Sequence, residues 1–205
     1  MTTETSSLVL DEVAQRALFT EARSPIRFDD RAVPLGVVRS AYDLIKWAPT
    51  SNNAMPLRLA IADSPEARAS LIAHAAPGNQ PKIETAPLVL VAASDHDFHE
   101  LSHITAAGVE GLRERLAGRP EARAVTAHDN TWLQIGYLIV GLRAAGLAVR
   151  PMGGFDHEGL TRDLLAGTAW HAEALLAVGY PEPQGNDGTG PRQGRPDWDQ
   201  AARVF

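Results

Sequence analysis

The stretch from Thr131 to Leu147 constrains the fold more than any other part of the chain. Its residues are apolar on nearly every side of a helical projection. A helix that is hydrophobic all round is buried, so we expect a central helix that ends at Gly146. The run is short for a membrane span, and Gln134 and Arg143 interrupt it.

Helical and strand patterns alternate along the rest of the chain. Apolar spacing predicts helices over residues 8–20, 34–47, 65–75 and 157–166, with a charged, alanine-rich helix or excursion over 108–127. Short apolar runs predict strands over 57–62, 88–93, 147–151 and 174–179. Because no internal repeat or clear boundary appears, we expect a single domain over residues 1–205.

The composition excludes several classes of protein. A formal charge of −6 without a long basic run argues against nucleic acid or an anionic membrane as the main partner. The absence of cysteine rules out disulfides, thiolate metal sites and cysteine nucleophiles. The first seven residues lack the basic and apolar regions of a signal peptide, so we expect a soluble cytoplasmic protein.

The segment Trp47–Pro56 joins a predicted helix to a predicted strand and concentrates polar side chains between two prolines. Pro49 disfavours helical structure for the residue before it, so the helix should end there. Thr50, Ser51 and Asn53 then offer hydrogen bonds from a partly fixed backbone, which suits a neutral polar ligand better than a metal. The alternative is a polar turn that binds nothing.

Five cationic side chains lie far apart in the sequence, in segments rich in glycine, proline or asparagine that we expect to be loops: Arg23, Arg27, Lys82, Arg192 and Arg195. Loops carry binding residues more often than helices do. If these cations converge, they would form an anion pocket in an acidic protein, suited to a phosphate group and a polarised ring. The alternative is surface charge on solvated connections.

Two adjacent glycines, Gly153 and Gly154, permit backbone conformations and a close ligand approach that a Cβ would block, or simply a tight turn. The histidines predict no metal site, because His99 and His103 could share a helical face but no third ligand follows at a known spacing. The glycines after residue 181 do not form a dinucleotide-binding fingerprint. No side chain is assigned a catalytic role.

Five motifs, in matching order, resemble those of the nitroreductase family. They are Arg23-Ser24-x-x-Arg27, Pro49-Thr50-Ser51-x-Asn53-x-x-Pro56, Asn79-x-x-Lys82, Gly146-Leu147 running to Pro151-Met152-Gly153-Gly154-Phe155, and Pro191-Arg192-x-x-Arg195. The resemblance covers nearly the whole chain and is greatest to the malonic semialdehyde reductase branch. Two residues depart from the family pattern: Ala22 replaces an arginine, and Met55 replaces a glutamine.

The resemblance implies an α+β fold with a central, mostly antiparallel sheet flanked by helices. It also implies an intertwined homodimer with FMN sites at the interface, and a C-terminal extension over 181–205 that reaches the partner subunit. Arg23, Arg27, Arg192 and Arg195 would hold the FMN phosphate, and Ser24 would also contact the cofactor. The flavin would meet Asn79, Lys82, Met152, Gly153 and Gly154, while Thr50, Ser51 and Asn53 would come from the other subunit.

The activity that the resemblance implies is hydride transfer from NAD(P)H through FMN to a small acceptor. Candidate acceptors are a malonic semialdehyde-type aldehyde, a nitro compound or a quinone. Little acid–base machinery is needed because the flavin carries the difficult step. Two alternatives stay open: a flavin-dependent dehydrogenase or oxidase of a biosynthetic pathway, and a flavin-binding or flavin-free dimer without catalytic activity.

Overall fold

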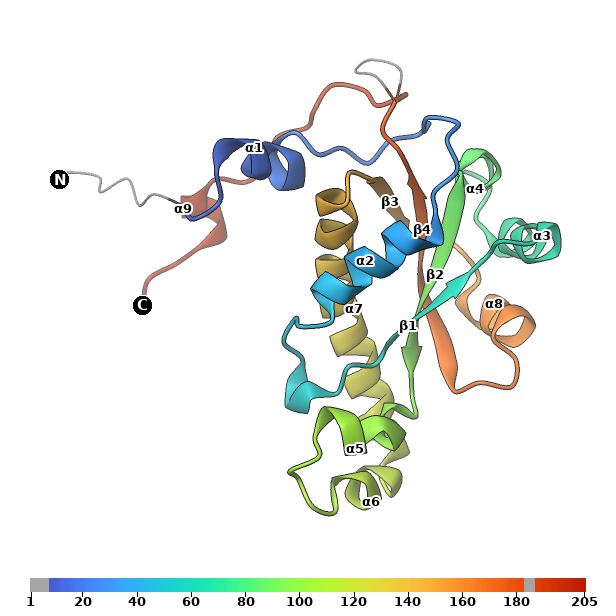
Figure 1. Cartoon of the computed structure of the whole chain (residues 1–205), viewed down its shortest axis with the longest axis vertical. Coiled ribbons are helices and arrows are strands. Elements are labelled where there is room, and N and C mark those ends of the chain that lie inside the picture. Colours follow the sequence, from blue (N-terminus) through green and yellow to red (C-terminus); the bar gives the residue numbers. More distant parts are fainter. Residues whose placement is uncertain (1–7, 183–186) are drawn as a thin grey trace.

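A four-stranded antiparallel sheet lies at the centre of the computed structural model, which describes residues 8–182 and 187–205. Its strands follow the order β1-β2-β4-β3 (Figure 1). They span Leu57–Ile61 (β1), Leu88–Asp95 (β2), Ala148–Met152 (β3) and Trp170–Gly179 (β4). The predicted α+β class with an antiparallel sheet is therefore confirmed, although β4 begins four residues earlier than we expected.

Strand β2 is buried along its whole length because both faces of the sheet are covered. Successive side chains of a strand point to opposite faces, so Leu88 and Leu90 enter one core while Val89 and Val91 enter the other. The first core lies beneath α2 (Leu35–Ile45) and α7 (Pro120–Ala144). The second lies beneath α3 (Pro65–His74), α4 (Gln80–Thr85) and α8 (His157–Leu164). Figure 1 shows these two layers on opposite sides of the sheet.

Helix α7 is longer and less completely buried than the sequence indicated. It spans 25 residues, and the charged run that we assigned to one helix or excursion over 108–127 is divided between the separate helix α6 (Leu112–Ala117) and the first turns of α7. Leu138 is fully buried, but Trp132, Leu133 and Tyr137 are 41%, 44% and 42% exposed. The prediction of a helix buried on every side is therefore wrong for the single chain, which covers one face and leaves an apolar face open.

Helix α4 was missed by the sequence analysis, which placed Lys82 in a loop. Pro81 lies in the first turn of this helix, where its missing N–H costs no hydrogen bond. A proline in a short segment rich in glycine and asparagine therefore marked a helix start and not a loop. Lys82 consequently has a fixed backbone.

The remaining elements are short. Residues 8–20, predicted as one helix, form α1 (Glu12–Gln15) and a π-helical turn, η1 (Arg16–Thr20). The others are η2 (Ser51–Asn53), η3 (Phe98–Leu101), α5 (Ser102–Thr105), α6 (Leu112–Ala117) and α9 (Trp198–Ala201). None of the helices in the described residues has the length and apolar character that crossing a bilayer requires.

After β4 the chain leaves the sheet, and α9 lies on the same side of the molecule as α1 (Figure 1). Trp198 is 77% exposed, and Val204 and Phe205 are exposed as well. These apolar side chains lie on a segment that is otherwise mostly polar. The extension over 181–205 stays a prediction, as does the single domain over 1–205; residues 1–7 and 183–186 lie outside the described residues.

Helices α2 and α7 approach closely at Gly141. A Cβ at this position would lie 2.4 Å from Cγ2 of Ile45 and 3.2 Å from the carbonyl oxygen of Ala41. We expect Gly141→Ala to lower the free energy of unfolding by about 1–3 kcal/mol, because overpacking forces the helices apart. Gly36→Ala, in α2 with no atom within 4 Å of the added Cβ, should be neutral or stabilising by about 0.5 kcal/mol. Urea unfolding at fixed protein concentration measures both, and an equal response of the two variants would contradict the close contact.

Candidate functional site

Three of the predicted site residues meet where α4 begins. The Lys82 ammonium donates a hydrogen bond to Oδ1 of Asn79 at 3.1 Å, and Nδ2 of Asn79 donates to the carbonyl of Gly154 at 3.0 Å. A Cβ on Gly154 would lie 3.0 Å from that Nδ2, and the residue does not have a positive φ. The requirement for glycine at 154 is therefore steric and not conformational. We call Asn79, Lys82 and Gly154 the lysine cluster.

The turn after β3 is held by a histidine to which we had assigned no role. His157 places Nε2 3.1 Å from the carbonyl oxygen of Gly153 and Nδ1 2.9 Å from that of Ala172, and its ring stacks on Phe155. Gly153 is exposed at this turn, whereas Met152 is 5% exposed and packs in the second core. The predicted pair Gly153 and Gly154 thus lies on a turn held by His157, and Asn79 links Gly154 to Lys82.

Arg150 connects the lysine cluster to the N-terminal arginine motif. Its Nη1 donates to the carbonyls of Ser24 and Pro25 at 2.8 and 3.3 Å. Burial lowers the pKa of the Lys82 ammonium, and the positive charge of Arg150 lowers it further. The sequence analysis missed Arg150, because a single arginine inside a short strand gives no signal of what it contacts.

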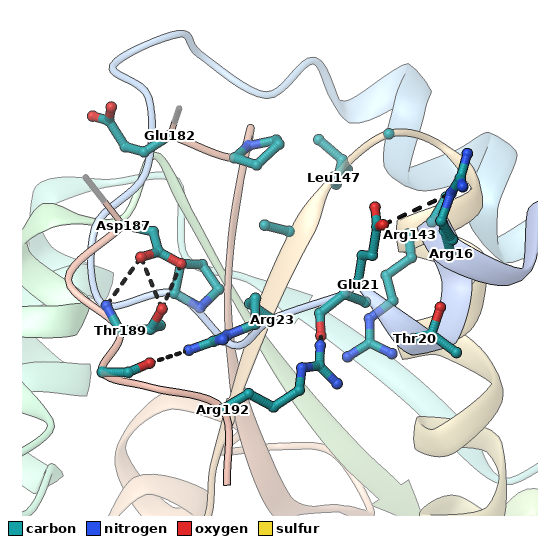
Figure 2. Close-up of a pocket in the computed structure, with 17 residues that line it drawn as sticks. Arg16, Thr20, Glu21, Arg23, Arg143, Leu147, Glu182, Asp187, Thr189 and Arg192 are labelled. Carbon is teal, nitrogen blue, oxygen red and sulfur yellow. Dashed lines mark hydrogen bonds and ion pairs between the residues drawn. The ribbon is translucent and has the colours of Figure 1, made fainter. Parts of the chain in front are cut away.

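The arginine motifs from the two ends of the chain meet around a cavity of about 790 Å³ (Figure 2). Arg23 donates to the carbonyl of Gly190, and Arg192 donates to the carbonyl of Ala22 at 2.8 Å. The backbone N–H of Arg27 donates to the carbonyl of Asp187 at 3.0 Å. Four guanidinium groups line the cavity: Arg16, Arg23, Arg143 and Arg192.

Of the predicted cations, Arg23 and Arg192 line this cavity, whereas Lys82 and Arg27 do not, and neither does Arg195. Arg195 is exposed, and its Nη1 donates to the carbonyls of Gln193 and Gly194. Arg16 and Arg143 line the cavity although we did not select them. In the sequence, Arg143 was noted only as a charged residue that interrupts an apolar helix. That interruption was the one sign that this part of the helix faces a polar environment.

The loop that holds Thr50, Ser51 and Asn53 lies at the opposite end of β1 from α3 and α4 (Figure 1). Within one chain it is therefore separated from the lysine cluster. Asn52, Asn53 and Met55 have φ values of 51°, 52° and 48°, in the left-handed region. Such strain persists where surrounding contacts impose it, and it concentrates at binding sites.

Two buried amides of α7 impose this conformation. Oδ1 of Asn130 accepts a hydrogen bond from the backbone N–H of Ser51 at 2.7 Å, and Oε1 of Gln134 accepts one from that of Leu57 at 3.0 Å. The side chain of Asn53 donates to the carbonyl of Thr105 at 2.7 Å. Gln134, which interrupts the apolar helix in the sequence, holds this loop through the hydrogen bond from Leu57.

The histidines that we weighed as metal ligands have other partners. His99 is 4% exposed in η3, while Nδ1 of His103 lies 2.9 Å from the carbonyl oxygen of Glu100. Within residues 8–182 and 187–205, no group of three or more histidine, aspartate or glutamate side chains is placed to hold a metal ion.

Comparison with known proteins gives the family. The model of the nitroreductase family matches residues 20–180. The chain belongs to the nitroreductase family. The match covers the motif Arg23–Arg27, the polar loop, the lysine cluster and the turn after β3. The C-terminal motif with Arg192 and Arg195 lies beyond it.

Relatives within the family cover nearly the whole chain. A protein of Streptomyces coelicolor named "Putative NADH dehydrogenase/NAD(P)H nitroreductase SCO5049" is 42% identical over 200 residues, which are 95% of this chain and 97% of that protein. A protein of Caulobacter sp. (strain K31) named "Putative NADH dehydrogenase/NAD(P)H nitroreductase" is 38% identical over 196 residues. These residues are 96% of this chain and 98% of that protein.

Solved structures share the fold at lower identity. A crystal structure of "putative nitroreductase ydfN" from Bacillus subtilis has a TM-score of 0.80 at 17% identity and covers 95% of this chain and 100% of that one. The structure of a "putative nitroreductase in complex with FMN" from Exiguobacterium sibiricum has a TM-score of 0.71 at 18% identity, covering 98% and 100%. These likenesses show that this chain has the nitroreductase fold.

The lowered pKa of Lys82 is directly measurable because the chain contains only two lysines, Lys46 and Lys82. We expect Arg150→Gln to raise the pKa of Lys82 toward the ordinary lysine value of 10.5, since a neighbouring positive charge is removed. Titration of ¹³C-lysine-labelled protein by NMR reports both groups, and Lys46 should not change. An unchanged Lys82 would show that Arg150 does not act on it.

The same shift sets a pH dependence of stability. Lys82 binds its proton more tightly in the unfolded chain than in the folded chain, because folding lowers its pKa. This lowers the free energy of unfolding, and the full loss is present at any pH below the pKa of Lys82 in the folded chain. The loss disappears as the pH rises from that pKa to the ordinary value of 10.5. Arg150→Gln should narrow the pH range over which the free energy of unfolding changes, because it raises the pKa of Lys82 in the folded chain.

Proposed function

We propose that this chain is an FMN-dependent NAD(P)H oxidoreductase that reduces a small acceptor. The observation that carries the proposal is the lysine cluster: a partly buried ammonium held by Asn79 beside the turn at Gly154. In the part of the chain that the structure describes, no ion pair joins Lys82 to a carboxylate. A cation without a counterion next to an exposed glycine turn suits a planar ligand that becomes negatively charged.

The residues present fit FMN at both ends of that molecule. Arg23 and Arg192 line a cavity and have further N–H groups beyond those that contact backbone carbonyls, which suits a doubly charged phosphate. Ser24, Arg27 and Arg195 lie on the same two segments and are the other candidates. Gly153, where an added Cβ would meet no atom within 4 Å, leaves room for a ring beside the backbone, and Asn79 holds Lys82 at the same turn through Gly154.

When bound, FMN supplies the hydride-transfer chemistry, which amino-acid side chains cannot supply. The contribution of Lys82 is to favour negative charge beside it, and the contribution of Asn79 is to orient that ammonium. Relatives of this chain carry NAD(P)H nitroreductase in their names, which supports NAD(P)H as the reductant. The proposed acceptors are a malonic semialdehyde-type aldehyde, a nitro compound or a quinone.

The test is to identify the bound flavin and then to follow NADH and NADPH oxidation without oxygen, one acceptor at a time. We expect Lys82→Ala to slow flavin reduction about tenfold or more while FMN stays bound, because the cation acts on developing charge. Lys46→Ala, which removes a partly exposed lysine paired with Asp43, is the matched control. Stopped-flow absorbance measures reduction, and an unchanged rate in Lys82→Ala would remove its proposed role.

The same assay separates the alternatives. Oxidation that proceeds only with oxygen would favour an oxidase, and a yellow protein that oxidises neither nicotinamide would favour flavin storage. A colourless protein that takes up no FMN would refute the flavin proposal itself.

We also propose that the functional unit is a homodimer. Leu44 and Trp47 are 64% and 83% exposed beside a groove of about 360 Å³ that Pro49 and Tyr137 also line. Contiguous apolar surface of this kind marks an interaction site. The polar loop begins at the end of this groove, so a second copy seated there would receive Thr50, Ser51 and Asn53, as a site shared between subunits requires.

Tyr137→Asp should weaken the dimer because it places a charge in an apolar interface. Multi-angle light scattering over a range of concentrations measures the shift toward monomer. Ile61→Asp, a residue 40% exposed on the edge strand β1, is the control and should leave the mass unchanged. A Tyr137→Asp protein that stays dimeric at low concentration would contradict this interface.

A further inference from the structure

His157, the first residue of α8, lies against a part of β4 that has no strand beside it. Strand β3 ends at Met152, which pairs with Leu175, so the edge of β4 before Leu175 is left without a strand partner on that side. Ala172, in this edge, donates its N–H to Oγ1 of Thr161 at 3.0 Å, and its carbonyl oxygen lies 2.9 Å from Nδ1 of His157. Two side chains of α8 therefore take the place of a neighbouring strand.

The other nitrogen of the same ring contacts the glycine turn. Nε2 of His157 lies 3.1 Å from the carbonyl oxygen of Gly153. The carbonyl oxygen of Gly154 accepts hydrogen bonds from the backbone N–H of Ala76 and from Nδ2 of Asn79, each at 3.0 Å. Both carbonyl groups of the glycine pair are thus held by the protein.

The N–H groups of the two glycines are not used in this way. The C=O and N–H of one planar peptide point in opposite directions, so a contact that fixes the carbonyl of Gly153 also fixes the direction of the N–H of Gly154. Within the part of the chain that the structure describes, neither glycine N–H donates a hydrogen bond to the protein. Because both glycines are exposed, the turn presents two oriented donors to a ligand.

Helix α8 has other contacts that hold it on the sheet. Leu160 is fully buried in the second core, and Oδ1 of Asp156 caps the helix by accepting a hydrogen bond from the N–H of Gly159 at 2.9 Å. His157 itself is exposed. The ring therefore contributes little burial to the helix, and its contact with Gly153 acts chiefly on the turn.

We propose that His157 is a positioning residue for the flavin site: through the carbonyl of Gly153 it holds the N–H of Gly154 toward the ring of the ligand. The inference rests on the proposed function, in which the flavin lies beside this turn. A donor that is already in place needs no reorganisation when negative charge develops on the ligand. Carbonyl oxygens only accept hydrogen bonds, so each of the two contacts needs a proton on the ring nitrogen that makes it.

Two substitutions remove these contacts one at a time. His157→Gln puts an N–H donor near the position of Nε2 and can keep the contact to Gly153. His157→Asn puts one near the position of Nδ1 and can keep the contact to Ala172. Both variants lose the ring that stacks on Phe155, so the comparison between them cancels that loss.

We expect His157→Asn to slow flavin reduction by NADH or NADPH about tenfold, and His157→Gln to stay within about twofold of the unsubstituted protein. Stopped-flow absorbance measures both rates. The visible absorption band of bound FMN should move in His157→Asn only, because that variant alone releases the donor beside the ring. Equal rates in the two variants would overturn the proposal.

Thr161→Val tests whether the effect is one of helix packing. This substitution removes the hydrogen bond from the N–H of Ala172 and the one that Thr161 donates to the carbonyl of His157 at 2.7 Å, but it leaves the contact to Gly153. Flavin reduction should therefore be unchanged. A loss as large as that in His157→Asn would show that the ring acts through the helix, and would overturn the proposal.

A measurement on the backbone separates this inference from the proposed function. The amide ¹⁵N shift of Gly154 in ¹⁵N-glycine-labelled protein reports on the hydrogen bond to the preceding carbonyl, with FMN bound and after its removal. We expect the shift to change in His157→Asn and to be kept in His157→Gln. No change in His157→Asn would overturn the proposal, whereas the expected change in a protein that takes up no FMN would support the hold on the turn and refute the flavin function.

Discussion

The packing of β2 between two apolar cores is the constraint on which the rest of the structure depends. All eight of its residues are buried, and the six from Leu88 to Ala93 are apolar, so neither face of the sheet centre offers polar side chains of β2 to a ligand. Polar chemistry is therefore confined to strand ends and to the segments that run along the edges. The loop before β1 and the turn after β3 are such places, and they carry Thr50, Ser51, Asn53, Gly153 and Gly154.

Electrostatics at those places follow one pattern, in which arginines are anchored by backbone carbonyls and not by carboxylates. Arg23, Arg143, Arg150 and Arg192 each contact a carbonyl oxygen of a distant segment. A carbonyl fixes the side chain without neutralising it, whereas a carboxylate partner such as that of Arg113 would cancel the charge. A chain with a formal charge of −6 can in this way keep a local positive field for an anion.

The sequence predicted local structure better than it predicted convergence. Apolar runs located all four strands, and proline and glycine located the loop at Pro49 and the turn at Gly153. Lys82 was misplaced because the same proline signal suits a loop and a first helical turn. Arg143 and Arg150 could not be found, since their roles depend on carbonyl groups more than a hundred residues away. The open face of α7 was not predicted, because an exposed apolar face has the same residue pattern as a buried one.

That open face and the strained polar loop have one explanation. Left-handed backbone at Asn52, Asn53 and Met55 costs about 1 kcal/mol or more at each residue. Asn130 and Gln134 stabilise the loop through hydrogen bonds to its backbone. Within one chain the loop is separated from the lysine cluster, so the single chain gives no functional reason for this conformation. The loop adjoins the apolar groove at Pro49, so a molecule that covers the groove must also meet the loop. If that molecule is a second copy, each copy presents its strained loop to the other, and the two halves of the site come together only when the apolar surface is buried.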